Sequence, residues 1–140
     1  MAKPARSSVT RTATVIDASA LLALFNDEPG AQAVLDALDG QCLISAVNQT
    51  EVLTKLLDKG LTDAEAASVM QSVEIEVLAF DASQSLEAAW LRRETRSVGL
   101  SLGDRACLAL ARSRKAVALT ADRPWSQVAD AVAVTVRCIR

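Results

Sequence analysis

The sequence of 140 residues contains no histidine and no tyrosine. The absence of histidine excludes a Ser-His-Asp triad, a Cys-His pair, a histidine zinc site and a ribonuclease that works with two imidazoles. Any hydrolytic chemistry near neutral pH must therefore rely on other groups. Carboxylates that hold a metal ion are the agents that this composition favours.

Cysteine is scarce, and long apolar runs are missing. Cys42, Cys107 and Cys138 are far apart in the sequence, and each lies among apolar residues. We interpret them as buried free thiols, which indicates a reducing compartment and hence a cytoplasmic protein. No stretch reaches the roughly 18–20 apolar residues that a membrane-spanning helix needs, so we expect no membrane association.

Charge is unevenly distributed along the chain, although the net charge is only −2. Residues 1–90 hold 5 basic and 13 acidic residues, whereas residues 91–140 hold 10 basic and 4 acidic residues. A basic part of this kind can face a phosphate backbone even in a protein that is acidic overall. The alternative interpretation is that the arginines cover the solvent-exposed faces of helices.

The order of the predicted elements favours a single α/β domain. Residues 1–12 are polar and typical of a flexible arm, so the domain covers residues 13–140. Short apolar strands alternate with helices, which predicts a mainly parallel sheet of four to five strands flanked by helices. We expect strands at 13–16, 42–44, 74–78, 116–119 and 131–136, and helices at 18–25, 31–38, 45–59, 62–72, 103–113 and from a cap at Asp81 or Ser83 toward Gly99.

Four acidic residues fall near the carboxyl ends of these strands. Asp17 follows the first strand, and Asp122 comes shortly after the fourth. Glu51 lies in the helix after the second strand, and Asp104 begins an apolar helix. Open parallel sheets bind ligands at this edge. Because crowded carboxylates repel one another, we expect Mg²⁺ or Mn²⁺ as the counter-charge there.

Each carboxylate also has a purely structural interpretation. Asp17 would cap the helix that follows it, Asp104 would sit favourably at a helix N-terminus, and Asp122 would be a turn residue. Glu51 would form an exposed i, i+4 pair with Lys55. The sequence leaves these alternatives open for each residue taken alone.

Small hydroxyl residues accompany three of the four acids. Ser19 lies two residues after Asp17, Ser101 three before Asp104, and Thr120 two before Asp122. We expect these hydroxyls to orient the carboxylates or bound waters from behind. Their alternative role is helix capping and turn formation.

Three segments and one helix position resemble the motifs of PIN-domain ribonucleases. Residues 14–23 (TVIDASALLA) resemble the opening strand and helix, and residues 99–111 (GLSLGDRACLALA) resemble the central motif. Residues 119–125 (LTADRPW) resemble the last acidic motif, and Glu51 matches the acidic helix position between them. The toxin subunits of VapBC toxin–antitoxin pairs match best within the family, over about residues 13–137.

This resemblance implies a three-layer α/β/α PIN-like domain with Mg²⁺- or Mn²⁺-dependent endoribonuclease activity. It implies that Asp17, Glu51, Asp104 and Asp122 form the acidic pocket that holds the metal, whose bound water hydrolyses RNA. The last of these positions is the most variable in the family. The resemblance also implies a cognate antitoxin as partner and a homodimer.

Arginines are needed to hold RNA, because an acidic pocket without metal repels it. Arg105 and Arg123 directly follow the third and fourth acids and are the stronger candidates for phosphate contact. Arg92 and Arg96 share one helix face and are further candidates.

Apolar residues provide further expectations. We expect Trp90, with Leu86 one helical turn before it, in the core, and Trp125 to close the core rather than stack on a base. An antitoxin would occupy apolar grooves near the first helix, whose candidate residues are Leu21, Leu22, Leu24 and Phe25. The alternative for these residues is a place in the core, which we favour for Leu21 and Leu24.

Two alternative functions remain at this stage. One is a PIN-like nucleic-acid-binding module without catalysis, and the other is a different magnesium-dependent phosphoryl-transfer or phosphatase domain. The second lacks its usual signatures: no adjacent acidic pair follows the first strand, and Ser19 stands where an Asp-x-Asp motif needs its second acid.

Overall fold

A computed structural model describes residues 12–140 as an α/β fold built on a five-stranded sheet. All neighbouring strands pair in parallel, in the order β3-β2-β1-β4-β5. The strands are β1 (Thr14–Ile16), β2 (Cys42–Ser45), β3 (Glu76–Leu78), β4 (Val117–Thr120) and β5 (Val136–Cys138). The predicted parallel sheet is therefore confirmed, and β1 and β4 are neighbours within it.

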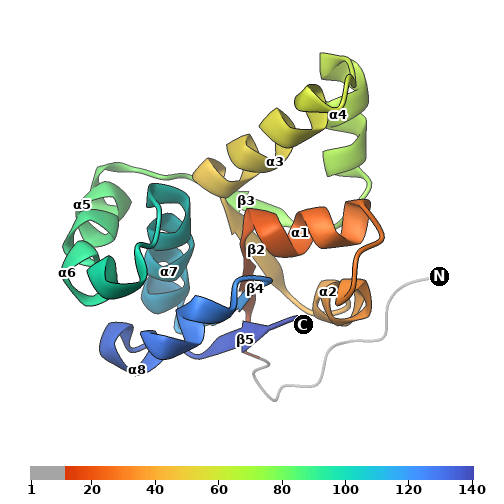
Figure 1. Ribbon diagram of the computed structural model, residues 1–140. Helices are drawn as coiled ribbons and strands as arrows, with labels where there is room; N and C mark the ends of the chain where they lie inside the picture. The colour runs from red at the N-terminus through yellow and green to blue at the C-terminus, as the bar shows by residue number, and fades with distance from the viewer. Residues whose placement is uncertain (1–11) are drawn as a thin grey trace.

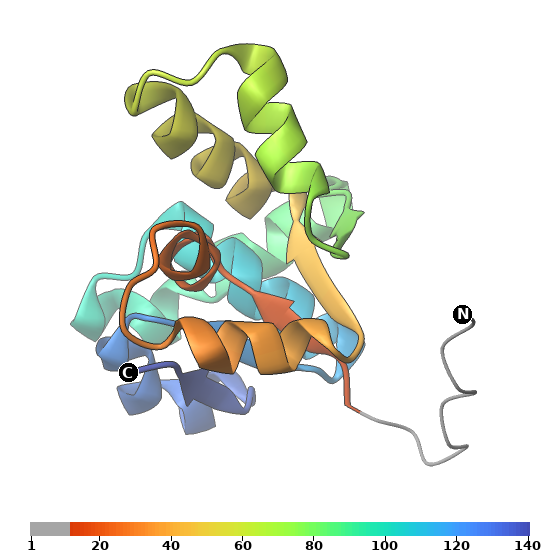
Figure 2. The same cartoon turned by 90° about the vertical axis from the view of Figure 1, so that its right-hand side faces the viewer.

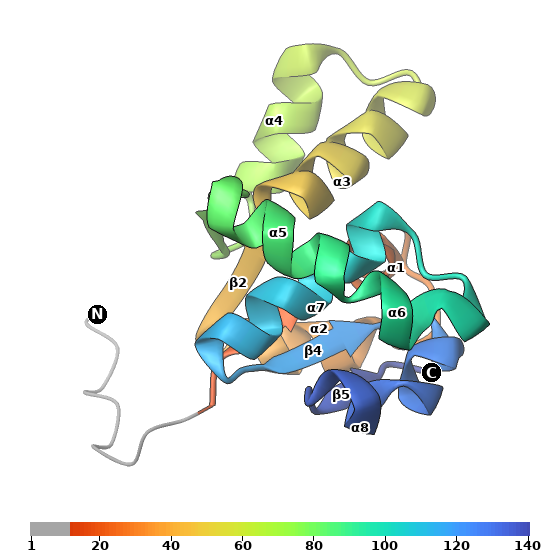
Figure 3. The same cartoon turned by 90° about the vertical axis from the view of Figure 1, so that its left-hand side faces the viewer.

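Helices cover both faces of this sheet, as the three-layer prediction requires. Figure 2 shows α1 and α2 over one face, and Figure 3 shows α5, α6 and α7 over the other. The hairpin of α3 and α4 projects beyond the edge of the sheet (Figure 1). The helices are α1 (Ala18–Phe25), α2 (Ala31–Leu38), α3 (Ala46–Asp58), α4 (Asp63–Gln71), α5 (Ala82–Trp90), α6 (Arg92–Thr95), α7 (Leu102–Arg114) and α8 (Ala129–Val132), with 3₁₀ turns η1 (Arg96–Val98) and η2 (Arg123–Gln127).

Two apolar cores lie on opposite sides of the sheet, because successive residues of a strand point to opposite faces. Val15 and Leu43 pack into the core under α5 and α7. Ile16 and Ile44, the next residues of the same strands, pack into the core under α1 to α4. Because these strands are buried on both faces, their sequences are continuous apolar runs.

Polar side chains begin several of the helices. Thr62 and Ser101 each form a capping box with the acidic residue three positions later. Ser45 accepts a hydrogen bond from the N–H of Val47, and Asp81 accepts one from the N–H of Gln84. Of the two caps considered for the helix after β3, Asp81 is the one used.

Two predicted elements have other boundaries in the structure. The fifth strand was expected at 131–136, but it occupies Val136–Cys138, and Ala129–Val132 form α8. The apolar run there is too short for periodicity to separate a buried helix from a strand. The helix expected from Asp81 or Ser83 toward Gly99 is divided into α5, α6 and η1.

The two tryptophans have opposite environments. Trp125 is fully buried, which confirms its predicted place in the core. Trp90 is 56% exposed, so its predicted place in the core is wrong, and its neighbour Leu86 is 54% exposed as well. The smaller Ala88 and the following Leu91 face the core instead, which turns the two large side chains outward.

The cysteines are free thiols in the structure, as predicted. Cys42 and Cys107 are buried, whereas Cys138 is only half-buried, so burial holds for two of the three. Burial raises the pKa of the Cys42 thiol to about 11 and the pKa of Cys107 well above its ordinary value. Both buried thiols are thus held in their neutral, unreactive form.

Two further expectations concern the first residues and the membrane. The polar arm predicted at residues 1–12 lies outside the described residues, apart from Thr12. Within residues 12–140, no helix is long and apolar enough to cross a membrane.

Candidate functional site

A pocket of about 310 Å³ opens at the carboxyl ends of the neighbouring strands β1 and β4. This is the edge at which open parallel sheets bind ligands. All four acids singled out in the sequence line the pocket, although they come from distant parts of the chain. The lining residues are Asp17, Ala18, Ser19, Asn48, Glu51, Asp104, Ala121, Asp122 and Arg140.

Asp17 is the most deeply placed of the acids, with 3% of its surface exposed. Its Oδ1 accepts a hydrogen bond of 2.8 Å from the N–H of Ala20, which makes it the N-cap of α1. The Ser19 hydroxyl lies 2.8 and 2.9 Å from the two carboxylate oxygens, and the Thr120 hydroxyl donates to Oδ2 at 2.7 Å. Asp17 therefore caps its helix and also lines the pocket.

Burial raises the pKa of Asp17 from 3.8 to about 6. Loss of hydration is the largest cause, and the charge of Asp104 adds to it. Hydrogen bonds from Thr120, Ala20 and Ser19 act in the opposite direction and favour the ionised form. A cation in the pocket would therefore relieve an unfavourable negative charge.

Hydrogen bonds join the ends of β1 and β4 behind the pocket. The Thr120 hydroxyl accepts the N–H of Asp122 at 3.0 Å, and the Ser19 hydroxyl accepts the N–H of Ala121 at 3.0 Å. The same two hydroxyls contact Asp17, so each one links the first acid to the segment that carries the fourth. Their geometry suits the orienting role expected for Ser19 and Thr120.

Asp104 lies in the first turn of α7. Its Oδ2 accepts the backbone N–H of Ser101 at 2.9 Å, and the Ser101 hydroxyl accepts the N–H of Asp104 at 3.2 Å. The Ser101 hydroxyl thus follows the helix-capping alternative, and its backbone N–H is what holds the carboxylate. This reciprocal pair fixes the direction in which Asp104 leaves the helix.

Glu51 is held against α7 by a neighbour that the sequence analysis missed. Asn48 is 1% exposed, and its Nδ2 donates to Glu51 Oε1 at 2.8 Å and to the carbonyl oxygen of Gly103 at 2.9 Å. A Cβ atom at Gly103 would lie only 2.6 Å from Cδ of Glu51. Among the described residues, no ion pair involves Glu51, so the alternative of a surface pair with Lys55 is not realised.

The signal for Asn48 was present in the sequence. Asn48 lies three positions before Glu51, and residues at this spacing share one helix face. Both partners of its Nδ2 are acceptors, which fixes the orientation of the amide. Its Oδ1 is buried and has no hydrogen-bond partner among the described residues.

The four arginines proposed for RNA lie outside the pocket lining. Arg105 points toward α5 and donates to the carbonyl oxygen of Ala88 at 2.9 Å, because consecutive helix residues diverge by about 100°. Arg123 donates to the carbonyl oxygen of Arg140 at 3.1 Å. Arg92 lies 3.5 Å from the carbonyl oxygen of Leu100, and Arg96 is exposed.

The donor set of the pocket fits a hard divalent cation. Carboxylate oxygens are the ligands that Mg²⁺ and Mn²⁺ prefer, and no histidine or exposed thiol competes for them in the lining. Asn48 lines the same pocket, and its Oδ1 is buried without a hydrogen-bond partner among the described residues. Within residues 12–140, no three acidic or cysteine side chains lie close enough together to hold a metal ion as they stand. The four acids therefore line the pocket without converging on a single point.

The PIN domain family model matches residues 14–131, which is most of the chain. The chain belongs to the PIN domain family. This finding confirms the resemblance to PIN domains that the sequence indicates. No curated protein sequence matches the chain significantly.

Solved structures of low sequence identity share the fold of this PIN domain. A toxin–antitoxin complex from Klebsiella pneumoniae matches with a TM-score of 0.71 and 18% identity, over 91% of this chain and 98% of the other. A DNA-bound VapBC from Salmonella typhimurium matches with a TM-score of 0.70 and 16% identity, over 93% of this chain and 100% of the other. VapC20 of Mycobacterium tuberculosis is a toxin that cleaves the sarcin-ricin loop. It matches with a TM-score of 0.69 and 19% identity, over 81% of this chain and 93% of the other.

Proposed function

We propose that this PIN domain, over residues 13–140, is a metal-dependent endoribonuclease and the toxin of a type II toxin–antitoxin pair. The observation that carries the proposal is the convergence of Asp17, Glu51, Asp104 and Asp122 on one pocket at the carboxyl edge of the sheet. A crowded set of carboxylates is costly to a fold unless a cation occupies it. The similarity to toxin subunits supports RNA as the substrate.

Mg²⁺ or Mn²⁺, when bound, would supply an activated water and neutralise charge that develops on the phosphate. Asp17 and Asp104 are the residues that we expect to hold it. Hydrogen bonds from Thr120 and Ser101 fix the carboxylates of Asp17 and Asp104. These side chains would therefore lose little conformational freedom when a metal ion binds. Glu51 and Asp122 would complete the site or orient the attacking water.

The proposal extends to the partners and the location of the protein. The similar structures include complexes of toxins with antitoxins, which supports a cognate antitoxin here. Leu22, Leu24 and Phe25 of α1 are half-buried and would contact it, whereas Leu21 is fully buried and belongs to the core. A homodimer and a cytoplasmic location complete the proposal.

Cleavage of total RNA tests the proposed function. Wild-type protein should produce fragments with Mg²⁺ and none with excess chelator, and Asp104→Asn should be inactive under both conditions. Water as the nucleophile leaves 5′-phosphate and 3′-hydroxyl ends. Cyclic phosphate ends, or cleavage that persists in the chelator, would contradict the mechanism.

Thr120→Val should change the pH dependence of cleavage. Valine preserves the shape of the side chain but removes the hydroxyl that donates to Asp17, so the pKa of Asp17 should rise further. We expect activity to fall by roughly tenfold at pH 6.5 and by less at pH 8, because a hydrogen bond to a charged group is lost. Initial rates between pH 5.5 and 8.5 measure this shift.

Thr95→Val is the matched control for this variant. Thr95 is buried too, but its hydroxyl donates to the carbonyl oxygen of Leu91, away from the pocket. Its pH profile should keep the wild-type shape. The same shape in Thr120→Val would refute the orienting role of the Thr120 hydroxyl.

Gly103→Ala should reduce cleavage without unfolding the protein. The new methyl group would collide with the Glu51 carboxylate, which is the flexible end of its side chain and can swing away. The contact with Asn48 would then be lost, and we expect cleavage to fall by roughly 10- to 100-fold, as when a supporting contact of a metal site is removed. Steady-state rates and thermal melting curves, recorded together, measure both effects.

Gly40→Ala serves as the control, because a methyl group there meets only the carbonyl oxygen of Ala37 at an ordinary 3.7 Å. Its activity should equal that of the wild type. A fully active Gly103→Ala protein would show that the position of Glu51 is unimportant.

A further inference from the structure

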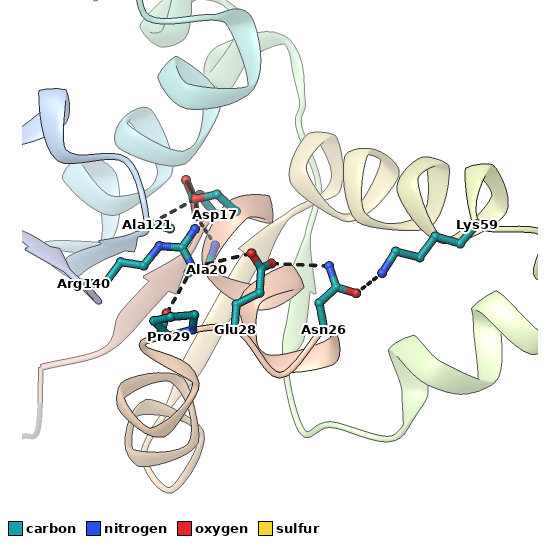
Figure 4. A network of polar contacts seen from close by, with 9 residues as sticks. Asp17, Ala20, Asn26, Glu28, Pro29, Lys59, Ala121 and Arg140 are labelled. Carbon is teal, nitrogen blue, oxygen red and sulfur yellow. Dashed lines mark hydrogen bonds and ion pairs between the residues drawn. The ribbon is translucent and has the colours of Figure 1, made fainter.

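One basic side chain, Arg140, lines the acidic pocket in the described part of the chain. It lies two residues beyond the end of β5, and its side chain is 37% exposed. Figure 4 shows it reaching from the end of β5 toward Asp17 and the loop after α1. The pocket thus combines four carboxylates with a single guanidinium.

The Arg140 guanidinium is anchored by the loop that follows α1. Its Nη1 donates to the carbonyl oxygen of Pro29 at 3.1 Å and lies 3.7 Å from Oε2 of Glu28. Glu28 accepts in turn from Asn26 at 3.4 Å, and Lys59, at the end of α3, donates to Asn26 (Figure 4). The loop after α1 therefore forms a continuous polar support for this one side chain.

The backbone of Arg140 is held as well. Arg123, which comes shortly after β4, donates to the carbonyl oxygen of Arg140 and so joins the two segments. Gly30 approaches the preceding residue so closely that a Cβ atom there would lie 2.7 Å from the carbonyl oxygen of Ile139. Gly30 also has a φ of 96°, so the tight turn that supports Arg140 depends on glycine.

These contacts leave most of the guanidinium available to a ligand. Arginine has five N–H donors in a planar fork that matches the oxygens of a phosphate. The ion pair of Arg140 is with Glu28, which is outside the pocket lining, so the four pocket acids remain for the metal. A phosphodiester needs such a cation, because the carboxylates around it repel its charge.

We propose that Arg140 binds the phosphate backbone of the substrate and positions the phosphodiester against the carboxylate pocket. The identity of that phosphodiester as RNA rests on the proposed function. Arg123 acts through Arg140 as a positioning residue, and Arg105 is committed to α5. We thus assign to Arg140 the phosphate contact that the sequence led us to expect from Arg105 and Arg123.

Binding of a fluorescein-labelled RNA 20-mer of mixed sequence, followed by anisotropy with Mg²⁺, tests this proposal. All proteins carry Asp104→Asn, so binding is measured without cleavage. Arg140→Gln should weaken binding by about tenfold, because a charge-assisted contact is lost. The slope of log affinity against log salt should become shallower by about 0.7, the contribution of one phosphate of a single strand.

Arg137→Gln is the matched control, since it removes the same charge from an exposed side chain of β5 outside the pocket lining. It should bind RNA within about twofold of the background protein and keep its salt slope. Equal binding and equal slopes for Arg140→Gln and Arg137→Gln would overturn the proposal.

Arg140→Lys keeps the test decisive if the glutamine variant does not fold, as judged by its melting curve. Lysine retains the charge but loses the planar fork, so binding should weaken while the salt slope stays near that of the background protein. Unchanged affinity in Arg140→Lys would overturn the assignment of a guanidinium contact. A failure of the proposed ribonuclease activity would appear separately, in the total RNA assay.

Discussion

Asp17→Asn is expected to lower RNA cleavage by roughly 10²- to 10³-fold, the loss that follows removal of one charge-stabilising group from an active site. The same substitution is expected to stabilise the metal-free protein at neutral pH. Both effects have one cause, which is the burial of an ionised carboxylate at the end of β1. Asparagine can still accept the N–H of Ala20, so the cap of α1 should survive.

The pH dependence of this stabilisation follows from the pKa of Asp17. Because its pKa is about 6 in the folded protein and 3.8 when the group is unperturbed, the folded state retains a proton that the unfolded state has lost between these values. The stability from this proton is complete below about pH 3.8 and is lost as the pH rises through about 6. The difference between these two pKa values corresponds to a loss of about 3 kcal/mol in the free energy of unfolding above pH 7.

Urea denaturation in the presence of a chelator measures the effect. The free energy of unfolding of Asp17→Asn should exceed that of the wild type at pH 7.5, and the gap should narrow at pH 4.5. Asp39→Asn, the same change at a position outside the pocket lining, should show no such trend. A variant less stable than the wild type at pH 7.5 would mean that Asp17 serves mainly as a structural cap.

Mg²⁺ or Mn²⁺ is expected to raise the melting temperature of the wild-type protein by about 5–10 °C. This range assumes metal at about 100 times its dissociation constant, which stabilises the folded state by about 2.7 kcal/mol. The rise should be larger at pH 7.5 than at pH 5.5, because a proton competes with the metal for Asp17 below its pKa of about 6.

Differential scanning fluorimetry with and without metal at both pH values measures this rise. Asp17→Asn and Asp104→Asn should abolish it, and Asp39→Asn should not. A rise of the same size in the Asp17 variant would place the bound metal outside the pocket.

The acidic residues of the site could be predicted because a parallel sheet fixes where its strands end. Asp17 and Asp122 follow β1 and β4, which are neighbours in the sheet. A short apolar segment ending in a polar residue is enough to place each of them. Their convergence therefore needed no knowledge of side-chain packing.

Arg140 could not be predicted in the same way. The sequence placed the fifth strand at residues 131–136, four residues before Arg140, whereas β5 ends at Cys138. Its direction also depends on the loop at residues 26–30, which is more than 100 residues away in the sequence and meets it only in the folded protein. No local pattern carries such a contact.

Trp90 shows a different limit of sequence patterns. Its spacing from Leu86 correctly indicates a shared helix face, but spacing does not say whether that face is buried. The face of α5 toward α7 is occupied by Ala88, because a small residue lets the two helices approach closely. Residue size was therefore a misleading guide to burial here.

The hydrogen bond from Thr120 to Asp17 spans 103 positions of the chain. Contacts with such a separation form late, since the intervening chain must first be closed into a loop. During synthesis on a ribosome, the opening strand and its helix emerge long before β4 can pair with them. A nascent chain that has not yet released residue 122 lacks one wall of the pocket, so the site can form only after all segments from β1 to residue 122 have left the ribosome.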